Sequence, residues 1–79
     1  MKPQTVVYHR NGLGNLVLFT PAMQAMAAID ESGKVDFCID SEWQDDRRST
    51  LIDFAKELPF VNEIINFPDA RLESYKKYF

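Results

Sequence analysis

The sequence has little of three residue types that often define small domains. It contains one cysteine, Cys38, one histidine, His9, and three glycines among 79 residues. A single cysteine excludes an intrachain disulfide, and one cysteine with one histidine supplies too few soft ligands for a zinc site. We therefore predict a domain that folds without a disulfide or a metal ion, with Cys38 as a buried core residue.

Long apolar runs and basic clusters are also missing. No apolar run reaches the roughly 20 residues that a transmembrane helix needs. The opening residues Met-Lys-Pro-Gln lack the apolar core of a signal peptide, so we expect a cytoplasmic protein with no transmembrane segment. The net charge is −3, and the basic pairs at 47–48 and 76–77 are short. Nucleic-acid binding is therefore disfavoured.

What the sequence does contain is an alternation of strand and helix patterns. β-branched and aromatic residues predict strands over residues 5–9, 34–39 and 61–67. Apolar residues at helical spacing predict helices over residues 13–29 and about 42–58, although a solvated loop equally fits the start of the second. A third helical spacing follows at the C-terminal end, in Leu72, Tyr75 and Phe79.

Strands that alternate with helices through short connections indicate a parallel sheet with right-handed crossovers. The predicted fold class is therefore α/β: a three-layer, Rossmann-like half-domain with a three-stranded parallel sheet, order 3-2-1, and flanking helices. Such a sheet is half of a doubly wound domain, and its first strand has an exposed edge. We predict that residues 1–79 are one half-domain, a fragment of a longer two-domain chain, with possible self-association through that edge.

The stretch from Thr5 to Pro21 combines a strand, a glycine turn and a helix. Glycines allow a positive φ or the close approach of another group, and the helix N-terminus then suits an anion or a polar ligand. The alternative is that Gly12 and Gly14 only shape the turn. The dinucleotide fingerprint is not satisfied, because Val17 occupies the position of its third glycine. A flavodoxin-like or dinucleotide-binding domain is therefore not supported.

The same stretch resembles a known family. Arg10, Gly12-Leu13-Gly14 and Thr20-Pro21-Ala22 resemble the N-terminal signature of glycosyltransferase family 9, which contains heptosyltransferase-like enzymes of the GT-B fold. Val35-Asp36-Phe37 and the residues 61–65 are similar to its second and third strands. The resemblance therefore spans roughly residues 4 to 68.

The resemblance implies a glycosyltransferase that moves a heptose-like sugar from a nucleotide-diphosphate sugar to a lipopolysaccharide or related glycan acceptor, without a cofactor or metal. In the GT-B arrangement the N-terminal domain mainly holds the acceptor, and the missing C-terminal domain mainly holds the donor. Because catalysis needs both substrates positioned together, the chain alone is expected to be inactive. The alternative function is a non-catalytic α/β binding or self-association module.

By the same resemblance, the substrate-binding residues are Arg10, Gly12, Leu13, Gly14 and Asn15. Asn15 is the candidate catalytic position, because it stands where the family typically has an aspartate proposed as the general base. An amide cannot take a proton at neutral pH, so the base is left unidentified. Asparagine also suits the N-terminal end of a helix, which is the alternative role of this residue.

Two further polar residues lie near the ends of the first two predicted strands. His9 is an alternative base, because imidazole titrates near neutral pH, although strand alternation favours an orientation away from the cleft. Asp40 either binds a sugar hydroxyl or caps the following helix, and we favour the cap.

Overall fold

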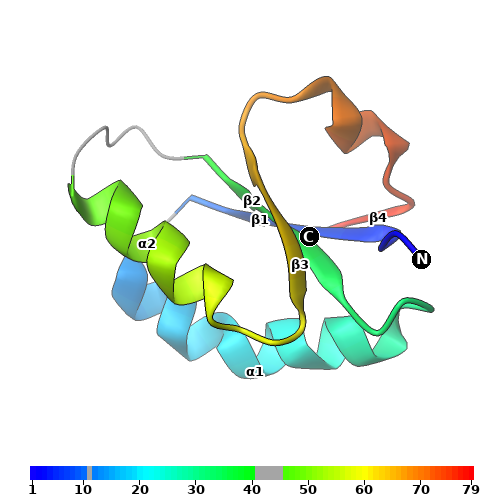
Figure 1. Ribbon diagram of the computed structural model, residues 1–79, viewed down its shortest axis with the longest axis horizontal. Helices are drawn as coiled ribbons and strands as arrows, with labels where there is room; N and C mark the ends of the chain where they lie inside the picture. The colour runs from blue at the N-terminus through cyan, green and yellow to red at the C-terminus, as the bar shows by residue number, and fades with distance from the viewer. Residues whose placement is uncertain (11, 41–45) are drawn as a thin grey trace.

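The computed structural model describes residues 1–10, 12–40 and 46–79. Within these residues the parallel α/β class and the 3-2-1 strand order are confirmed, with a fourth strand added in the order β3-β2-β1-β4 (Figure 1). The elements are, in chain order, β1 (Thr5–His9), α1 (Leu13–Ile29), β2 (Val35–Ile39), α2 (Asp46–Lys56), β3 (Val61–Asn66), the 3-10 helix η1 (Ala70–Ser74) and β4 (Lys77–Tyr78).

The C-terminal segment differs from the prediction of a third helix. The carboxylate of Asp69 accepts from the N–H of Arg71 at 2.8 Å and caps η1, but the helical turn ends at Ser74. The backbone of Tyr75 is already extended. Leu72 and Tyr75 instead cover part of the sheet, because both side chains pack against one of its faces.

The added strand β4 occupies the edge of β1 that was predicted to be open. The N–H groups of Lys76 and Lys77 both donate to the carbonyl of Gln4, at 2.9 and 3.1 Å, and the N–H of Phe79 donates to the carbonyl of Val6 at 3.1 Å. The polar backbone of a buried strand requires partners, and β4 supplies them. The prediction of three strands is therefore wrong by one, and self-association through β1 would require β4 to be displaced.

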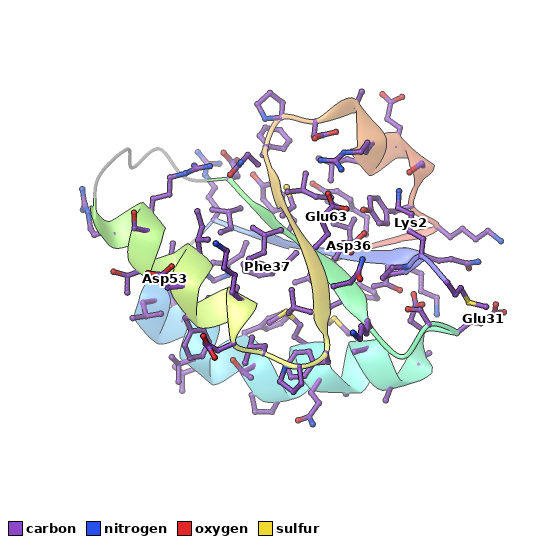
Figure 2. All side chains as sticks on the ribbon, viewed as in Figure 1. Lys2, Glu31, Asp36, Phe37, Asp53 and Glu63 are labelled. Carbon is purple, nitrogen blue, oxygen red and sulfur yellow. The ribbon has the colours of Figure 1, made fainter. Side chains whose placement is uncertain are left out.

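Both helices cover one face of the sheet (Figure 1). Side chains of a strand alternate between faces, while helical residues three or four apart share a face. Phe37 of β2 therefore projects between sheet and helices, whereas its neighbour Asp36 lies on the other side (Figure 2). The buried residues on this helical face are Val7, Leu16, Met23, Ala27, Val35, Phe37, Ile39, Leu51 and Ala55.

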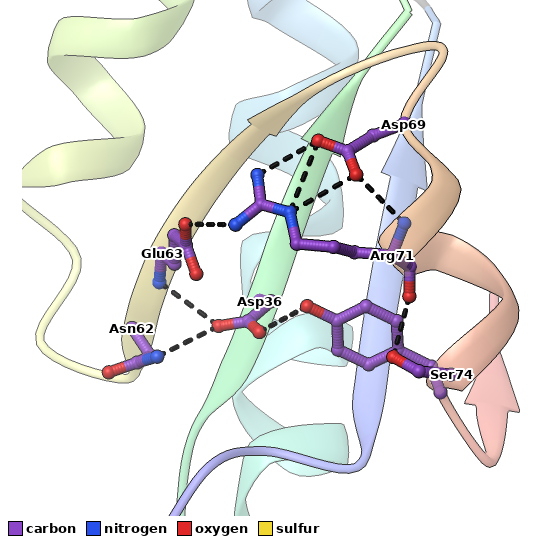
Figure 3. Close-up of polar contacts among 7 residues, drawn as sticks. Asp36, Asn62, Glu63, Asp69, Arg71 and Ser74 are labelled. Carbon is purple, nitrogen blue, oxygen red and sulfur yellow. Dashed lines mark hydrogen bonds and ion pairs between the residues drawn. The ribbon is translucent and has the colours of Figure 1, made fainter.

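The opposite face has a smaller apolar cluster and a polar network. Val6, Cys38 and Ile65 are buried there, which confirms the prediction that Cys38 is a core residue. Asp36 is fully buried, and its carboxylate accepts from the side chain of Asn62 at 3.0 Å and the N–H of Glu63 at 3.1 Å. The hydroxyl of Tyr75 donates to the other oxygen (Figure 3). Tyr75, the residue after η1, is thus attached to β2, and β2 to β3, by directional bonds.

Helix α1 has the predicted bounds and is continuous through Pro21. The hydroxyl of Thr20 donates back to the carbonyl of Leu16 at 2.9 Å, inside the helix. Helix α2 ends at Lys56, before the predicted end at Leu58, because the residues after Lys56 form a turn before Pro59. The predicted start of this helix falls on residues 41–45, which lie outside the described part of the chain.

The end of α1 is fixed to the start of β1 by Asp30. Its carboxylate accepts from the N–H of Gln4 at 2.9 Å and from the N–H and hydroxyl of Ser32 at 2.9 and 2.7 Å. Burial by itself raises the pKa of Asp30, but the hydrogen bonds from Ser32, Thr5 and Gln4 outweigh it and lower the pKa to about 2. Asp30 is therefore ionised at neutral pH, and the turn that follows closes at Gly33, whose φ is +75°.

Candidate functional site

The strand order creates a switch point between β1 and β4. The chain leaves β1 through α1 towards β2 on one side, and β3 is followed by β4 on the other side of β1. In open α/β sheets, ligands bind beyond the carboxyl ends of the strands at such a point. A pocket of about 480 Å³ opens there, lined by Tyr8, His9, Asn15, Phe19 and Phe79.

The predicted site residues are divided between this pocket and its surroundings. Asn15 lines the switch-point pocket from the first turn of α1. Gly12 and Leu13 line a separate pocket of about 200 Å³, together with Arg47 and Thr50. Arg10 follows β1 directly and is exposed. The structure thus brings Asn15, but not the whole predicted set, to the switch-point pocket.

The two glycines do not provide a positive φ. Gly12 is the N-cap of α1 and is extended, with φ −80° and ψ −178°. Gly14 lies inside the helix, where an added side chain would meet no described atom within 4 Å. Among the described residues only Gly33 has a positive φ. The turn therefore depends on an extended N-cap, and Asn15 is three residues beyond it rather than the cap itself.

His9 faces the helices and reaches the pocket, contrary to the predicted orientation. It alternates with Tyr8 and shares the face of Val7, where its ring stacks on Phe37 with centroids 5.8 Å apart. Nε2 lies 3.3 Å from the carbonyl oxygen of Gly12. A carbonyl only accepts, so this contact requires a hydrogen on Nε2. The ring is only 6% exposed, so its orientation is held by packing.

A second polar pair lies beside the pocket and was not predicted. The hydroxyl of Tyr8 donates to the carboxylate of Asp40, which raises the pKa of Tyr8 to about 12. The N–H of Asp40 also donates to the carbonyl of His9 at 3.0 Å. The parallel register places Tyr8 opposite Cys38, two residues before Asp40 on the same face. Only the register between strands could have indicated this pair, because the two residues are 32 positions apart in sequence.

Cys38 lies close to this pair but is not a nucleophile at neutral pH. It is fully buried, and burial raises the pKa of its thiol to about 11, with the charges of Asp40 and Asp69 acting in the same direction. A thiol must ionise to attack or to bind a metal. Within the described residues, no three side chains of the His, Cys, Asp and Glu types come together as possible metal ligands.

These features define an open parallel α/β domain with a candidate ligand pocket at the switch point of its sheet. Neither helix in the described part of the chain has the length and apolar character needed to cross a membrane. No family model, curated protein or solved structure matches the chain.

Proposed function

We propose that this chain is the acceptor-side part of a glycosyltransferase similar to family 9, which moves a heptose-like sugar from a nucleotide-diphosphate donor to a lipopolysaccharide or related glycan acceptor. The observation that supports the proposal is the switch-point pocket lined by Asn15, the residue at the position of that family's acidic base. The assignment of Asn15 to the position of the base rests on the sequence resemblance, whereas the place of the pocket rests on the strand order of the sheet.

The lining of the pocket suits a sugar hydroxyl. The amide of Asn15 both donates and accepts hydrogen bonds, and His9 adds a ring nitrogen held in place by Phe37. Phe19 and Phe79 supply apolar walls that exclude water around these groups. In this proposal Asn15 orients the acceptor hydroxyl, and the donor sugar is held by a second domain outside these 79 residues.

Binding of the two substrates to the 79-residue chain tests the proposal. A delipidated lipopolysaccharide core oligosaccharide is titrated into the labelled chain and followed by amide chemical shifts, and a nucleotide-diphosphate sugar is titrated separately. We expect saturable shifts at His9 and Asn15 with the oligosaccharide and none with the nucleotide sugar. The substitution Asn15→Leu should weaken oligosaccharide binding about tenfold, the equivalent of one good hydrogen bond.

Gln24→Leu is the matched control. Gln24 is an exposed amide on the same helix that does not line the pocket, so its removal should leave the affinity unchanged. If Gln24→Leu and Asn15→Leu weaken binding equally, or if only the nucleotide sugar binds, the assignment of the pocket to an acceptor sugar is wrong.

A further inference from the structure

Three aromatic side chains meet beside the pocket, and we call them the aromatic platform: Tyr8, Phe67 and Tyr78. The ring of Tyr8 meets Phe67 edge to face, with centroids 5.5 Å apart, and lies nearly parallel to Tyr78 at 5.8 Å. These are the preferred geometries of aromatic pairs, so the rings support one another in fixed orientations.

The platform is exposed although it is apolar. Phe67 is 43% exposed and Tyr78 is 52% exposed. Single exposed apolar residues need no explanation, but two exposed rings that both contact Tyr8 indicate a binding surface. The rings come from β1, from the residue after β3 and from β4, so the arrangement exists only once the sheet has formed.

The platform is continuous with the switch-point pocket. Tyr8 belongs to both, since it also lines the pocket. At the same place Asp40 accepts the hydroxyl of Tyr8 and is half-buried. A carboxylate has lone pairs for several donors, so Asp40 can accept further hydroxyl groups without releasing Tyr8.

These groups together match the chemistry of a pyranose ring. Such a ring has a face of polarised C–H bonds, which the negative face of an aromatic ring attracts, and a rim of hydroxyl donors, which a carboxylate accepts. A phosphate would be repelled by the charge of Asp40. A purely apolar ligand would leave that carboxylate desolvated without a partner.

We propose that the aromatic platform binds a second pyranose unit of the glycan whose terminal unit occupies the switch-point pocket. The inference rests on the proposed function, because it extends the same glycan from the pocket across Tyr8. The exposed faces of Phe67 and Tyr78 stack on the sugar ring, and Asp40 accepts its hydroxyl groups. The platform thereby selects an acceptor of at least two sugar units.

Saturation-transfer NMR with the delipidated core oligosaccharide tests this inference. Saturation of the protein's aromatic protons should pass to the C–H protons of a sugar unit next to the terminal one. Phe67→Ala and Tyr78→Leu should each lower the affinity about fivefold, which corresponds to the loss of one aromatic contact. Phe67→Trp should retain binding, because it keeps an aromatic face at that position.

Leu18→Ala is the matched control, because Leu18 is an 80% exposed apolar residue on α1 that does not belong to the platform. Amide spectra of each variant verify that the fold is retained. If Asn15→Leu weakens binding while Phe67→Ala and Tyr78→Leu bind as the unmodified chain does, the platform inference is overturned and the proposed function stands. If only the platform variants weaken binding, the rings hold a sugar that does not extend from the pocket, and both the platform inference and the assignment of the pocket fail.

Discussion

The two faces of the sheet are stabilised in different ways. On the helical face of the described chain, nine buried residues from two strands and two helices form one apolar cluster. On the opposite face, three of the described residues are buried in the cluster, and a five-residue 3-10 helix takes the place of a full helix. The missing apolar area is replaced there by hydrogen bonds to the buried carboxylate of Asp36 (Figure 3).

The difference explains where the aromatic platform is available. Apolar packing on the helical face is non-directional, and the polar groups of the switch-point pocket, His9 and Asn15, lie at the end of the sheet. On the other face a short covering segment leaves Phe67 and Tyr78 half exposed. The face with less apolar burial is therefore the one with aromatic and carboxylate groups accessible to a ligand. Substitutions on both faces test this comparison.

Phe37→Ala should have the largest effect, because Phe37 is fully buried between the sheet and the helices (Figure 2). Removing a buried phenylalanine costs about 3–5 kcal/mol of the free energy of unfolding. Since a domain has only about 5–15 kcal/mol in total, we expect a largely destabilised chain. Phe67→Ala removes the same atoms from the other side, where the ring is 43% exposed, and should cost about 1 kcal/mol. Equal shifts of the urea midpoint would contradict the comparison.

Asp36→Ala should have an intermediate effect. It removes the shared acceptor of Asn62, Glu63 and Tyr75, and we expect a loss of about 2–3 kcal/mol in urea unfolding. Tyr75→Phe removes a single donor and should cost about 1–2 kcal/mol. Tyr75→Phe should also accelerate hydrogen exchange in β4, because the hydroxyl of Tyr75 attaches the segment before β4 to β2.

The matched control for Tyr75→Phe is Tyr78→Phe, which deletes the same hydroxyl from a half-exposed ring. We expect no change in stability from it. Unchanged exchange in β4 for Tyr75→Phe would mean that apolar packing of Leu72 and Tyr75, and not the bond to Asp36, holds the segment. The comparison between the two faces would then lose its physical basis.

The elements that could be predicted from sequence are those with a local signal. The β-branched runs gave β1 with its observed bounds, and β2 and β3 to within one residue at an end. Helix α1 followed from its apolar spacing, and its N-terminal turn brought Asn15 to the correct end of the sheet. In these cases the residues that form the sequence pattern are close neighbours in the chain, and the structure they predict is the one that the fold contains.

The C-terminal segment could not be predicted in this way. Tyr75 and Leu72 fit a helical period, but the partner of the Tyr75 hydroxyl is Asp36, 39 positions earlier. The strand β4 exists because β1 has a free edge, which is a property of the sheet and not of residues 77–78. For the same reason no local pattern indicated that Tyr8, Phe79 and Asp40 meet, and the aromatic side of the candidate site was missed.

Arg71→Met should have the smallest effect on the free energy of unfolding. It tests the contribution of the surface ion pairs apart from that of the buried hydrogen bonds to Asp36. The guanidinium of Arg71 pairs with Glu63 at 2.7 Å and Asp69 at 2.9 Å, but all three side chains are partly exposed (Figure 3). Exposed pairs contribute about 0–1 kcal/mol and are screened by salt, so the urea midpoint should move little. Asp69→Ala, which also removes the cap on the Arg71 N–H, should cost about 1 kcal/mol more. A loss above about 2 kcal/mol for Arg71→Met would mean that the surface ion pairs, and not the hydrogen bonds to Asp36, stabilise this face of the sheet.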